Sequence, residues 1–248
     1  MVLWVKRNNH RHHFVKVSIK SIHSELNRNA EFAYKKSQQQ FFKEGIELYG
    51  VRIPVVRKIA AAQWREVRKL DKKNIFALCE ELLKTNMQED SVIAYGFAHR
   101  MRKKLELKDF AVFERWVKSY VNNWAKCDDV CTGALGELIA MYPQLIQKTV
   151  AWQKSKNRWV RRASAVALIV PVKRANILPD VFAATDALMA DEDDLVRKGY
   201  GWLLKEANNV YPKEIFAYVM KYKANMPRVA LRYAIEKMPK DWKKQAMA

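Results

Sequence analysis

The sequence predicts an all-α protein in which antiparallel helix pairs stack into a solenoid. Only seven glycines and seven prolines occur among 248 residues, and no Pro-, Gly- or Ser-rich linker divides the chain. No segment keeps the apolar–polar alternation of a half-buried strand long enough to predict a sheet, whereas helical periodicity accounts for nearly the whole chain. The third observation is an internal repeat in the second half of the chain.

This repeat recurs at a spacing of 36 residues. Pro143 aligns with Pro179, and residues 159–163 (WVRRA) align with residues 195–199 (LVRKG) without a gap. A looser third copy begins at Pro212. Helix pairs at this spacing are typical of HEAT-like repeats, because one pair cannot bury its apolar faces alone and stacks on its neighbours. We therefore expect a right-handed superhelical solenoid of HEAT-like antiparallel helix pairs with one concave face.

Capping residues support the individual elements. Asp71 and Asp109 are N-cap candidates, since a carboxylate accepts hydrogen bonds from the free amides of a first turn. Proline fits the first turn because it has no amide to satisfy. The expected helices are residues 24–45, 54–69, 72–86, 89–103, 109–122, 129–141, 143–154, 158–170, 179–190, 194–207, 212–222, 227–237 and 239–246, with Pro143, Pro179, Pro212 and Pro227 in first turns.

The charge balance points to an anionic partner. Lys and Arg total 46 against 26 for Asp and Glu, which gives a net charge of +20. Such an excess costs self-repulsion, and a nucleic acid is the first candidate to offset it. An anionic membrane surface is the second candidate, and a merely soluble basic protein is the alternative without a partner.

Cysteine usage and hydropathy exclude several classes. The three cysteines, Cys79, Cys127 and Cys131, are too few and odd in number for a disulfide framework. A zinc site at Cys127 and Cys131 would need two more ligands, which no nearby residue supplies. No apolar run approaches the roughly 20 residues of a membrane span. We therefore expect no metal, no cofactor and no membrane segment.

The N-terminus differs from the rest of the chain. Residues 1–22 read as a basic extension that we expect to be mobile, and they lack the apolar core of a signal peptide. His10, His12 and His13 could bind a metal, but a solvated basic tail explains them as well. Residues 23–248 are expected to form a single repeat domain that carries both the nucleic-acid-binding surface and the site.

Basic residues recur at one repeat position. The second helices of the pairs begin with Arg161 and Arg162, then Lys198, then Arg228 and Arg232. Second helices of HEAT-like pairs usually line the concave face, and cations beside the free amides of a helix start suit phosphates. The alternative is a set of solvated helix starts. Arg52, which follows the Tyr49–Gly50 turn, is either a further DNA contact or a cap.

The stretch WAKCDDVC at residues 124–131 is the most informative of the chain. Asp128 and Asp129 open an expected helix, and Trp124 precedes Asp128 by four residues. An aromatic face beside a carboxylate suits a partner that is polyanionic overall but cationic at one point, as an alkylated base in DNA is. The alternatives are a core tryptophan and an N-cap at Asp128, where an amide would keep much of the capping.

Four stretches carry a resemblance to a known family. They are YGVRIPVVRKIA at 49–60, WAKCDD at 124–129, NRWVRRASAV at 157–166 and GWLLKE at 201–206. Their order and spacing resemble the DNA alkylation-repair family, and in particular its HEAT-like-repeat DNA glycosylases of the AlkD type. The resemblance extends from about residue 30 to about residue 240.

The resemblance implies a set of functional residues. Trp124, Asp128 and Trp202 match the two tryptophans and the aspartate that face DNA in the family. Arg161 and Arg162 match its basic cluster. Lys205 stands where the family commonly has an arginine, a change that keeps the charge but loses the planar fork.

The chemistry is consistent with these residues. Alkylation at N3 or N7 gives a purine a positive charge and weakens its glycosidic bond, so that the sugar develops oxocarbenium character as the base departs. A carboxylate near C1′ stabilises this charge and orients water, while aromatic faces attract the cationic nucleotide. A good leaving group needs no general acid.

We therefore predict a monofunctional glycosylase that excises alkylated purines from duplex DNA in base excision repair. It is expected to be a monomer of the bacterial cytosol or nucleoid. A non-catalytic DNA-binding or damage-recognition protein is the alternative, and an adaptor for an acidic protein is a third reading. The preferred adduct, and whether the base is flipped, are open from sequence.

Overall fold

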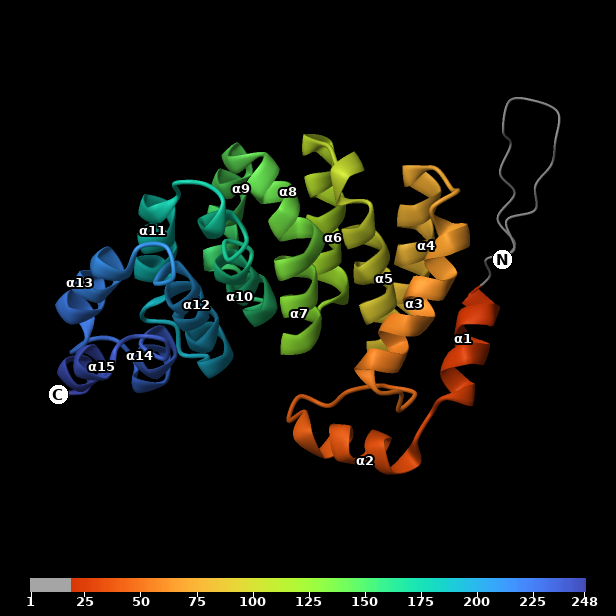
Figure 1. Ribbon diagram of the computed structural model, residues 1–248, viewed down its shortest axis with the longest axis horizontal. Coiled ribbons are helices and arrows are strands. Elements are labelled where there is room, and N and C mark those ends of the chain that lie inside the picture. Colours follow the sequence, from red (N-terminus) through yellow and green to blue (C-terminus); the bar gives the residue numbers. More distant parts are fainter. Residues whose placement is uncertain (1–18) are drawn as a thin grey trace. The chain divides into compact units, whose positions relative to one another are not determined.

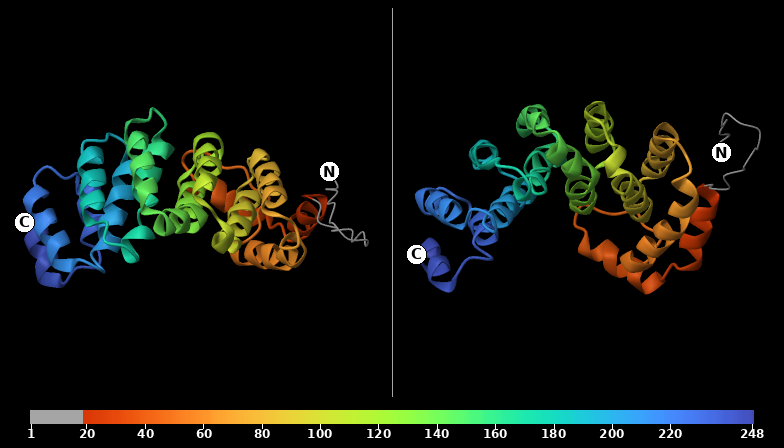
Figure 2. Two further views of the ribbon diagram at one scale, coloured as in Figure 1. Left: turned by 90° about the horizontal axis from the view of Figure 1, so that it is seen from above. Right: turned by 45° about the horizontal axis from the view of Figure 1, so that its top comes forward.

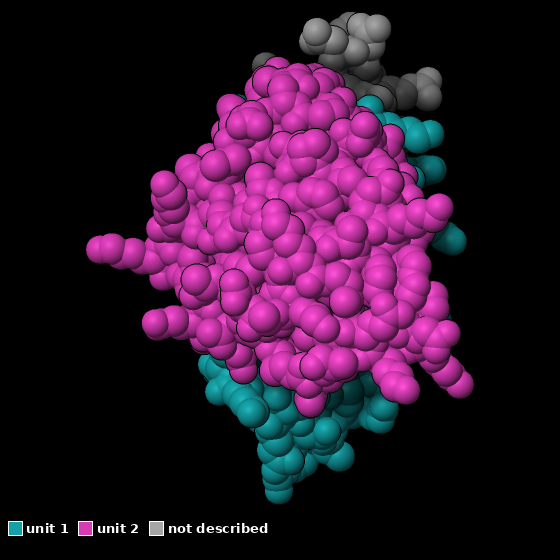
Figure 3. Space-filling view, turned by 90° about the vertical axis from the view of Figure 1, so that its left-hand side faces the viewer, with its two compact units in different colours: residues 1–105 teal, residues 106–248 magenta. Residues whose placement is uncertain are grey.

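The structure is a computed structural model that describes residues 19–248, and in this range every regular element is a helix. The predicted all-α class is confirmed (Figure 1). None of the helices in the described part is long and apolar enough to cross a membrane. The chain divides by its internal contacts into two compact units, residues 1–105 and 106–248, which Figure 3 colours separately. The single domain expected over residues 23–248 stays a prediction.

The first unit is built around an antiparallel pair, α4 and α5, with α3 packed on α5. Asp71 caps α4 as predicted, because its carboxylate accepts a hydrogen bond from the Asn74 amide at 2.8 Å. The elements are α1 (Ile19–Arg28), α2 (Phe32–Phe41), α3 (Ile53–Val67), α4 (Lys72–Lys84), α5 (Gln88–Arg100) and the 3₁₀ turn η1 (Arg102–Lys104).

The turn at Tyr49 to Arg52 is held by one buried carboxylate. Glu89 accepts hydrogen bonds from the amides of Tyr49, Gly50 and Val51, at 3.0, 2.8 and 2.9 Å. Gly50 has φ +103°, and a Cβ there would lie 2.8 Å from the Lys35 Cβ atom. This turn therefore needs glycine for its backbone conformation and for the close approach of α2.

The second unit contains the repeat. Its elements are η2 (Leu107–Asp109), α6 (Phe110–Tyr120), α7 (Trp124–Val130), the π-helical segment η3 (Cys131–Leu135), α8 (Gly136–Met141), η4 (Pro143–Leu145), α9 (Ile146–Val150), η5 (Ala151–Lys154), α10 (Arg158–Val166), η6 (Pro171–Lys173), α11 (Leu178–Leu188), α12 (Asp194–Ala207), α13 (Pro212–Tyr222), α14 (Arg228–Ala234) and α15 (Lys240–Met247).

The second helices of the three repeats, α10, α12 and α14, pack on one another in succession (Figure 2). Two glycines of α12 make this packing close. A Cβ at Gly199 would lie 3.2 Å from Cγ of Arg162 in α10, and a Cβ at Gly201 would lie 2.8 Å from the Ala230 carbonyl oxygen in α14. The contacts with α10 and α14 thus occupy two sides of α12. Trp202, which follows Gly201, is partly exposed.

We predict that Gly201→Ala lowers the free energy of unfolding by about 1–3 kcal/mol, because the new methyl group meets backbone atoms of α14 that cannot move aside. The gain in helix propensity offsets only about 0.5–1 kcal/mol. Urea denaturation checks this prediction. Gly96→Ala is the control, because its Cβ would meet only the mobile end of the Arg100 side chain at 3.1 Å. Equal stabilities of the two variants would contradict it.

Several boundaries differ from the sequence prediction, three of them near the N-terminus or the candidate site. The expected helix 24–45 is two helices, α1 and α2, which break at residues 29–31. Residues 1–18 of the expected extension, including its three histidines, lie outside the described range, but Ile19 begins α1 and Ile22 is fully buried. The expected helix 129–141 begins earlier, at Trp124, and its middle is the π-helical segment around Gly133.

The other capping predictions had mixed outcomes. Pro143, Pro179 and Pro212 stand in the first turns of η4, α11 and α13, whereas Pro227 directly precedes α14. Asp109 directly precedes α6, but its carboxylate accepts from the Glu106 amide at 2.7 Å and not from the amides of α6.

Candidate DNA-facing site

Helix α7 places Trp124 and Asp128 on one face. Asn123 is the N-cap, and its side chain accepts a hydrogen bond from the Lys126 amide at 2.9 Å. Asp128 therefore lies inside the helix, one turn after Trp124. The N-cap alternative for Asp128 is wrong, because Asn123 starts the helix a turn earlier than the acids do. Its carboxylate is free for another partner.

That partner is Arg162 of α10. The guanidinium donates from Nε to Oδ1 of Asp128 at 2.9 Å and from Nη2 to Oδ2 at 3.0 Å, a bidentate pair. The Arg162 side chain is 6% exposed and that of Asp128 is 19% exposed. Both are thus largely removed from water, and two parallel hydrogen bonds fix the plane of the carboxylate.

The same arginine reaches α12. Its Nη1 donates to the Leu195 carbonyl, and its aliphatic part fills the room left by Gly199. Arg162 therefore joins α7, α10 and α12. This differs from the phosphate contact expected from the sequence, because the guanidinium is buried and three of its five N–H donors are engaged within the protein.

Burial shifts the pKa of Asp128 more strongly than Arg162 does. Removal from water raises the pKa of Asp128 to about 6, although the charge and hydrogen bonds of Arg162 oppose the shift. Asp128 is consequently ionised at pH 7 and above and protonates in mild acid. A carboxylate held this way carries its charge in a poorly hydrated place, where it acts on a nearby cation more strongly than in water.

Trp124 and Trp202 are exposed in part, which separates them from the core tryptophans. Trp116 is fully buried and Trp152 is 2% exposed. Trp202 stands seven residues after Leu195 on α12, so both lie on about the same helix face. Trp124 and Trp202 are thus less buried than these two core tryptophans, and their role in DNA binding stays a prediction.

A second carboxylate accompanies Trp202. The indole Nε1 donates to Glu206 at 3.4 Å, and Glu206 also pairs with Lys173 at 2.7 Å and Lys237 at 3.1 Å. Burial by itself would raise the pKa of Glu206, but the hydrogen bonds from the two lysines outweigh it, so the pKa is lowered. Glu206 thus stays charged and orients the indole edge, while Asp128 titrates near neutrality.

Besides Arg162, three further predicted DNA-binding cations are ion-paired. Arg161 donates from Nε to Oδ2 of Asp191 at 2.6 Å, Lys205 lies 3.1 Å from Glu236, and Arg52 forms a pair with Glu31. These contacts tie neighbouring elements together. They also neutralise part of the expected basic track, because a paired cation attracts phosphate less than a free one.

The other predicted cations are available. Lys198 is partly exposed, and Arg228 and Arg232 are exposed on one face of α14. None of these three side chains forms an ion pair within residues 19–248. They and Trp202 belong to consecutive second helices, so the part of the track that remains lies on α12 and α14.

A comparison with known protein families shows the family to which the chain belongs. Residues 22–238 match the family described as "DNA alkylation repair enzyme". The chain belongs to this family. The match covers α7, α10 and α12 and thus every residue of the Asp128–Arg162 cluster. No curated protein matches significantly.

A solved structure has a similar fold. A "Predicted DNA alkylation repair enzyme from Enterococcus faecalis" superposes with a TM-score of 0.76, over 86% of this chain and 98% of its own, at 15% identity. At this identity the likeness establishes the fold only.

The roles of two residues in the site were not predicted from the sequence. Glu206 stands four residues after Trp202, a spacing that places both on one helix face and that could have singled it out. The pairing of Arg162 with Asp128 had no sequence signal, since 34 residues separate the two. Within the described range, no group of three or more His, Cys, Asp or Glu could hold a metal ion.

Proposed function

We propose that this member of the DNA alkylation repair family is a DNA glycosylase that hydrolyses the N-glycosidic bond of cationic N3- or N7-alkylated purines in duplex DNA. The observation that carries the proposal is the Asp128 carboxylate, held by Arg162 one turn from the partly exposed Trp124. Trp202 of α12, which is also partly exposed, supplies a second aromatic surface.

The carboxylate is suited to the charge of the transition state. As the alkylated base departs, positive charge develops at C1′ of the sugar, and a fixed anion stabilises it without having to reorganise. Arg162 occupies one lone pair of each Asp128 oxygen, and a carboxylate oxygen has two. The remaining lone pairs can face the sugar and orient a water molecule for attack. The base leaves neutral, so no general acid is required.

Arg162 has a positioning role in this mechanism. It holds the plane of the carboxylate and keeps its pKa from rising further. The charge of Arg162 is neutralised by Asp128. Binding of the DNA backbone therefore depends on other exposed cations, which include Lys198, Arg228 and Arg232. Trp124 and Trp202 contribute cation–π attraction of about 0.5–2 kcal/mol each to a desolvated cationic nucleotide.

The alternative is a protein that binds damaged DNA without cleaving it, in which the Asp128–Arg162 pair only joins α7 to α10. The direct test is incubation with methylated duplex DNA and chromatography of the released bases. Release of free methylpurine that depends on the protein supports the proposal. DNA binding without release supports the alternative, and a lack of salt-sensitive DNA binding favours an adaptor for an acidic protein.

We expect the unpaired cations to dominate the salt dependence of DNA binding. The triple variant Lys198→Ala, Arg228→Ala, Arg232→Ala is expected to make the slope of log K against log salt less negative by up to about 2.7, since each phosphate contact contributes about −0.9. Fluorescence anisotropy with undamaged duplex measures this. Lys213→Ala is the control, because Lys213 is exposed on α13, the first helix of the third repeat, and not on a second helix. An unchanged slope in the triple variant would refute the track.

The excision rate is expected to depend on the ionisation of Asp128. With a folded pKa of about 6, about 90% of the carboxylate is ionised at pH 7 and about 10% at pH 5. The single-turnover rate should thus rise about ninefold between these values and level off above pH 7. Bound phosphates move the midpoint upward, because negative charge favours the protonated form. Spontaneous base loss without protein is subtracted, and a rate that falls over this range would contradict the assignment.

A further inference from the structure

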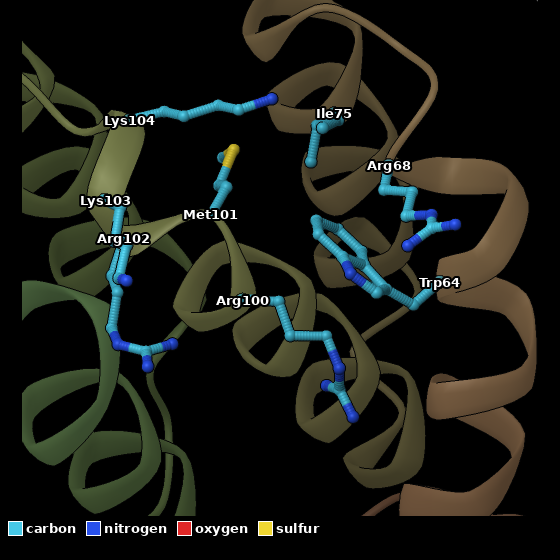
Figure 4. Close-up of a pocket in the computed structure, with 8 residues that line it drawn as sticks. All are labelled: Trp64, Arg68, Ile75, Arg100, Met101, Arg102, Lys103 and Lys104. Atoms are coloured by element: carbon cyan, nitrogen blue, oxygen red, sulfur yellow. The ribbon is translucent and has the colours of Figure 1, made fainter.

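The first unit contains a cavity that the proposed function does not use. It has a volume of about 280 Å³ and lies where α3 and α5 end and α4 begins (Figure 4). Its apolar lining comes from Trp64 of α3, Ile75 of α4 and Met101, which follows α5. Trp64 is partly exposed and packs against the buried Phe97, with ring centroids 5.8 Å apart. The indole is therefore fixed in place as one wall.

The polar lining of the cavity is entirely cationic. Its remaining residues are Arg68, Arg100, Arg102, Lys103 and Lys104, and no carboxylate is among them. None of these five side chains forms an ion pair within residues 19–248. In the second unit, by contrast, Arg161 and Arg162 are each paired with an aspartate.

Backbone carbonyls accept hydrogen bonds from some of these cationic side chains. Arg100 Nη1 donates to the Gly96 carbonyl at 3.1 Å, and Arg102 Nη1 donates to the His99 carbonyl at 3.3 Å. Lys72 of α4 donates to the Lys104 carbonyl at 3.3 Å, which ties η1 to the start of α4. In Figure 4, Lys104 extends across the cavity toward the side formed by α3 and α4.

This arrangement costs free energy unless an anion offsets it. Five like charges around one small cavity repel each other, and burial lowers the pKa of Arg100 with no carboxylate to oppose the shift. The negative end of the α5 dipole stabilises cations in its last turn. The α3 dipole acts in the same way on Arg68, which directly follows the end of α3, but neither dipole accounts for an aromatic wall beside the charges.

We propose that this cavity binds a nucleoside phosphate, with its base against Trp64 and its phosphates between Arg68 and Lys104. Stacking of a base on an aromatic side chain contributes about 1–3 kcal/mol, and clustered cations are the usual partners of phosphate. The volume is near the lower end of small-molecule sites, which suits one nucleotide unit. That unit is either a free nucleotide or the terminal nucleotide of a single DNA strand, since both offer the same chemistry.

Isothermal titration calorimetry on the full-length protein tests this proposal with four probes. These are ADP, pyrophosphate, adenosine and a 5′-phosphorylated DNA trinucleotide. Arg68→Ala with Lys104→Ala removes two exposed cations from opposite sides of the cavity, and Trp64→Leu removes the aromatic wall. The matched control is Lys58→Ala with Arg65→Ala, which removes the same charge from exposed positions of α3 outside the cavity.

ADP or the trinucleotide should bind at least about tenfold more tightly than pyrophosphate or adenosine, because each of the latter has only half of the recognised groups. Arg68→Ala with Lys104→Ala should weaken this binding about tenfold, and the control should leave it unchanged. Trp64→Leu should weaken ADP binding but spare pyrophosphate. The tighter of ADP and the trinucleotide identifies the source of the nucleotide.

Three results would overturn the proposal: no binding of either nucleotide probe, equal affinities for ADP and pyrophosphate, or equal losses in the cavity variant and the charge-matched control. The experiment involves no base excision. Its failure would therefore leave the role of Asp128 untouched, and the converse holds as well.

Discussion

Asp128→Asn is expected to lower the single-turnover excision of 7-methylguanine about 100- to 1,000-fold, the usual cost of removing one preorganised electrostatic group. The carboxylate stabilises charge that is larger at the sugar in the transition state than in the ground state, so the loss falls on the chemical step and not on DNA binding. The effect is smaller for a base that leaves readily by itself. Chromatography of the released base under excess protein measures the rate, and anisotropy measures the binding.

Asp129→Asn is the matched control, because it makes the same chemical change one residue further along α7. Asp129 is also partly exposed, and the carboxylate that pairs with Arg162 is that of Asp128. If Asp128→Asn cleaves as fast as the parent, or if Asp129→Asn is the slower variant, the catalytic carboxylate is assigned wrongly.

The structure changes the effect that we expect Asp128→Asn to have on stability. From the sequence, an amide would keep a capping role and cost little stability. In the structure the residue is the counterion of a buried arginine, and the amide offers one acceptor and no charge. We therefore expect the free energy of unfolding to fall by about 1–3 kcal/mol. Excision is best compared at a temperature where both proteins are fully folded.

Arg162→Ala is expected to have the largest effect on stability, about 3–5 kcal/mol, because it leaves the Asp128 carboxylate without its counterion and opens a cavity beside Gly199. Loss of the positive charge favours the neutral acid, so the pKa of Asp128 should rise above its present value of about 6. The midpoint of the pH–rate profile should move upward with it. Urea denaturation and single-turnover rates between pH 5 and about 8 measure the two effects.

The neighbouring arginine provides the control. Arg161→Ala breaks a pair with Asp191 in which the arginine is 21% exposed, and it should cost about 1 kcal/mol without moving the pH midpoint. Arg162→Lys, which keeps the charge but not the fork, should lie between the parent and Arg162→Ala. A stable Arg162→Ala protein whose only defect is uniformly weaker DNA binding would show that Arg162 is a phosphate contact after all.

The part of the fold that depends on local patterns could be predicted from the sequence. The periodicity that predicts helices and the proline at the start of each repeat depend on neighbours within a few residues. The 36-residue shift correctly places α10 and α12 as equivalent second helices, and the looser third copy adds α14. The start of α7 was missed because Asn123 and Asp128 are both good caps, and only the backbone shows which one accepts the hydrogen bond.

The candidate site divides in the same way. Trp124 and Asp128 could be singled out because an aromatic residue and an acid four positions apart share a helix face, whatever else the helix touches. The sequence alone thus determined the family resemblance, the all-α class and the pairing of an aromatic face with a carboxylate. Which cations are free was decided only by tertiary structure. Arg161 and Arg162 are adjacent and chemically identical, yet Arg162 is buried against Asp128 and Arg161 lies beside Asp191. Partners more than 30 residues away set that difference, because the energy of a charge depends on the burial and counterions that packing brings to it.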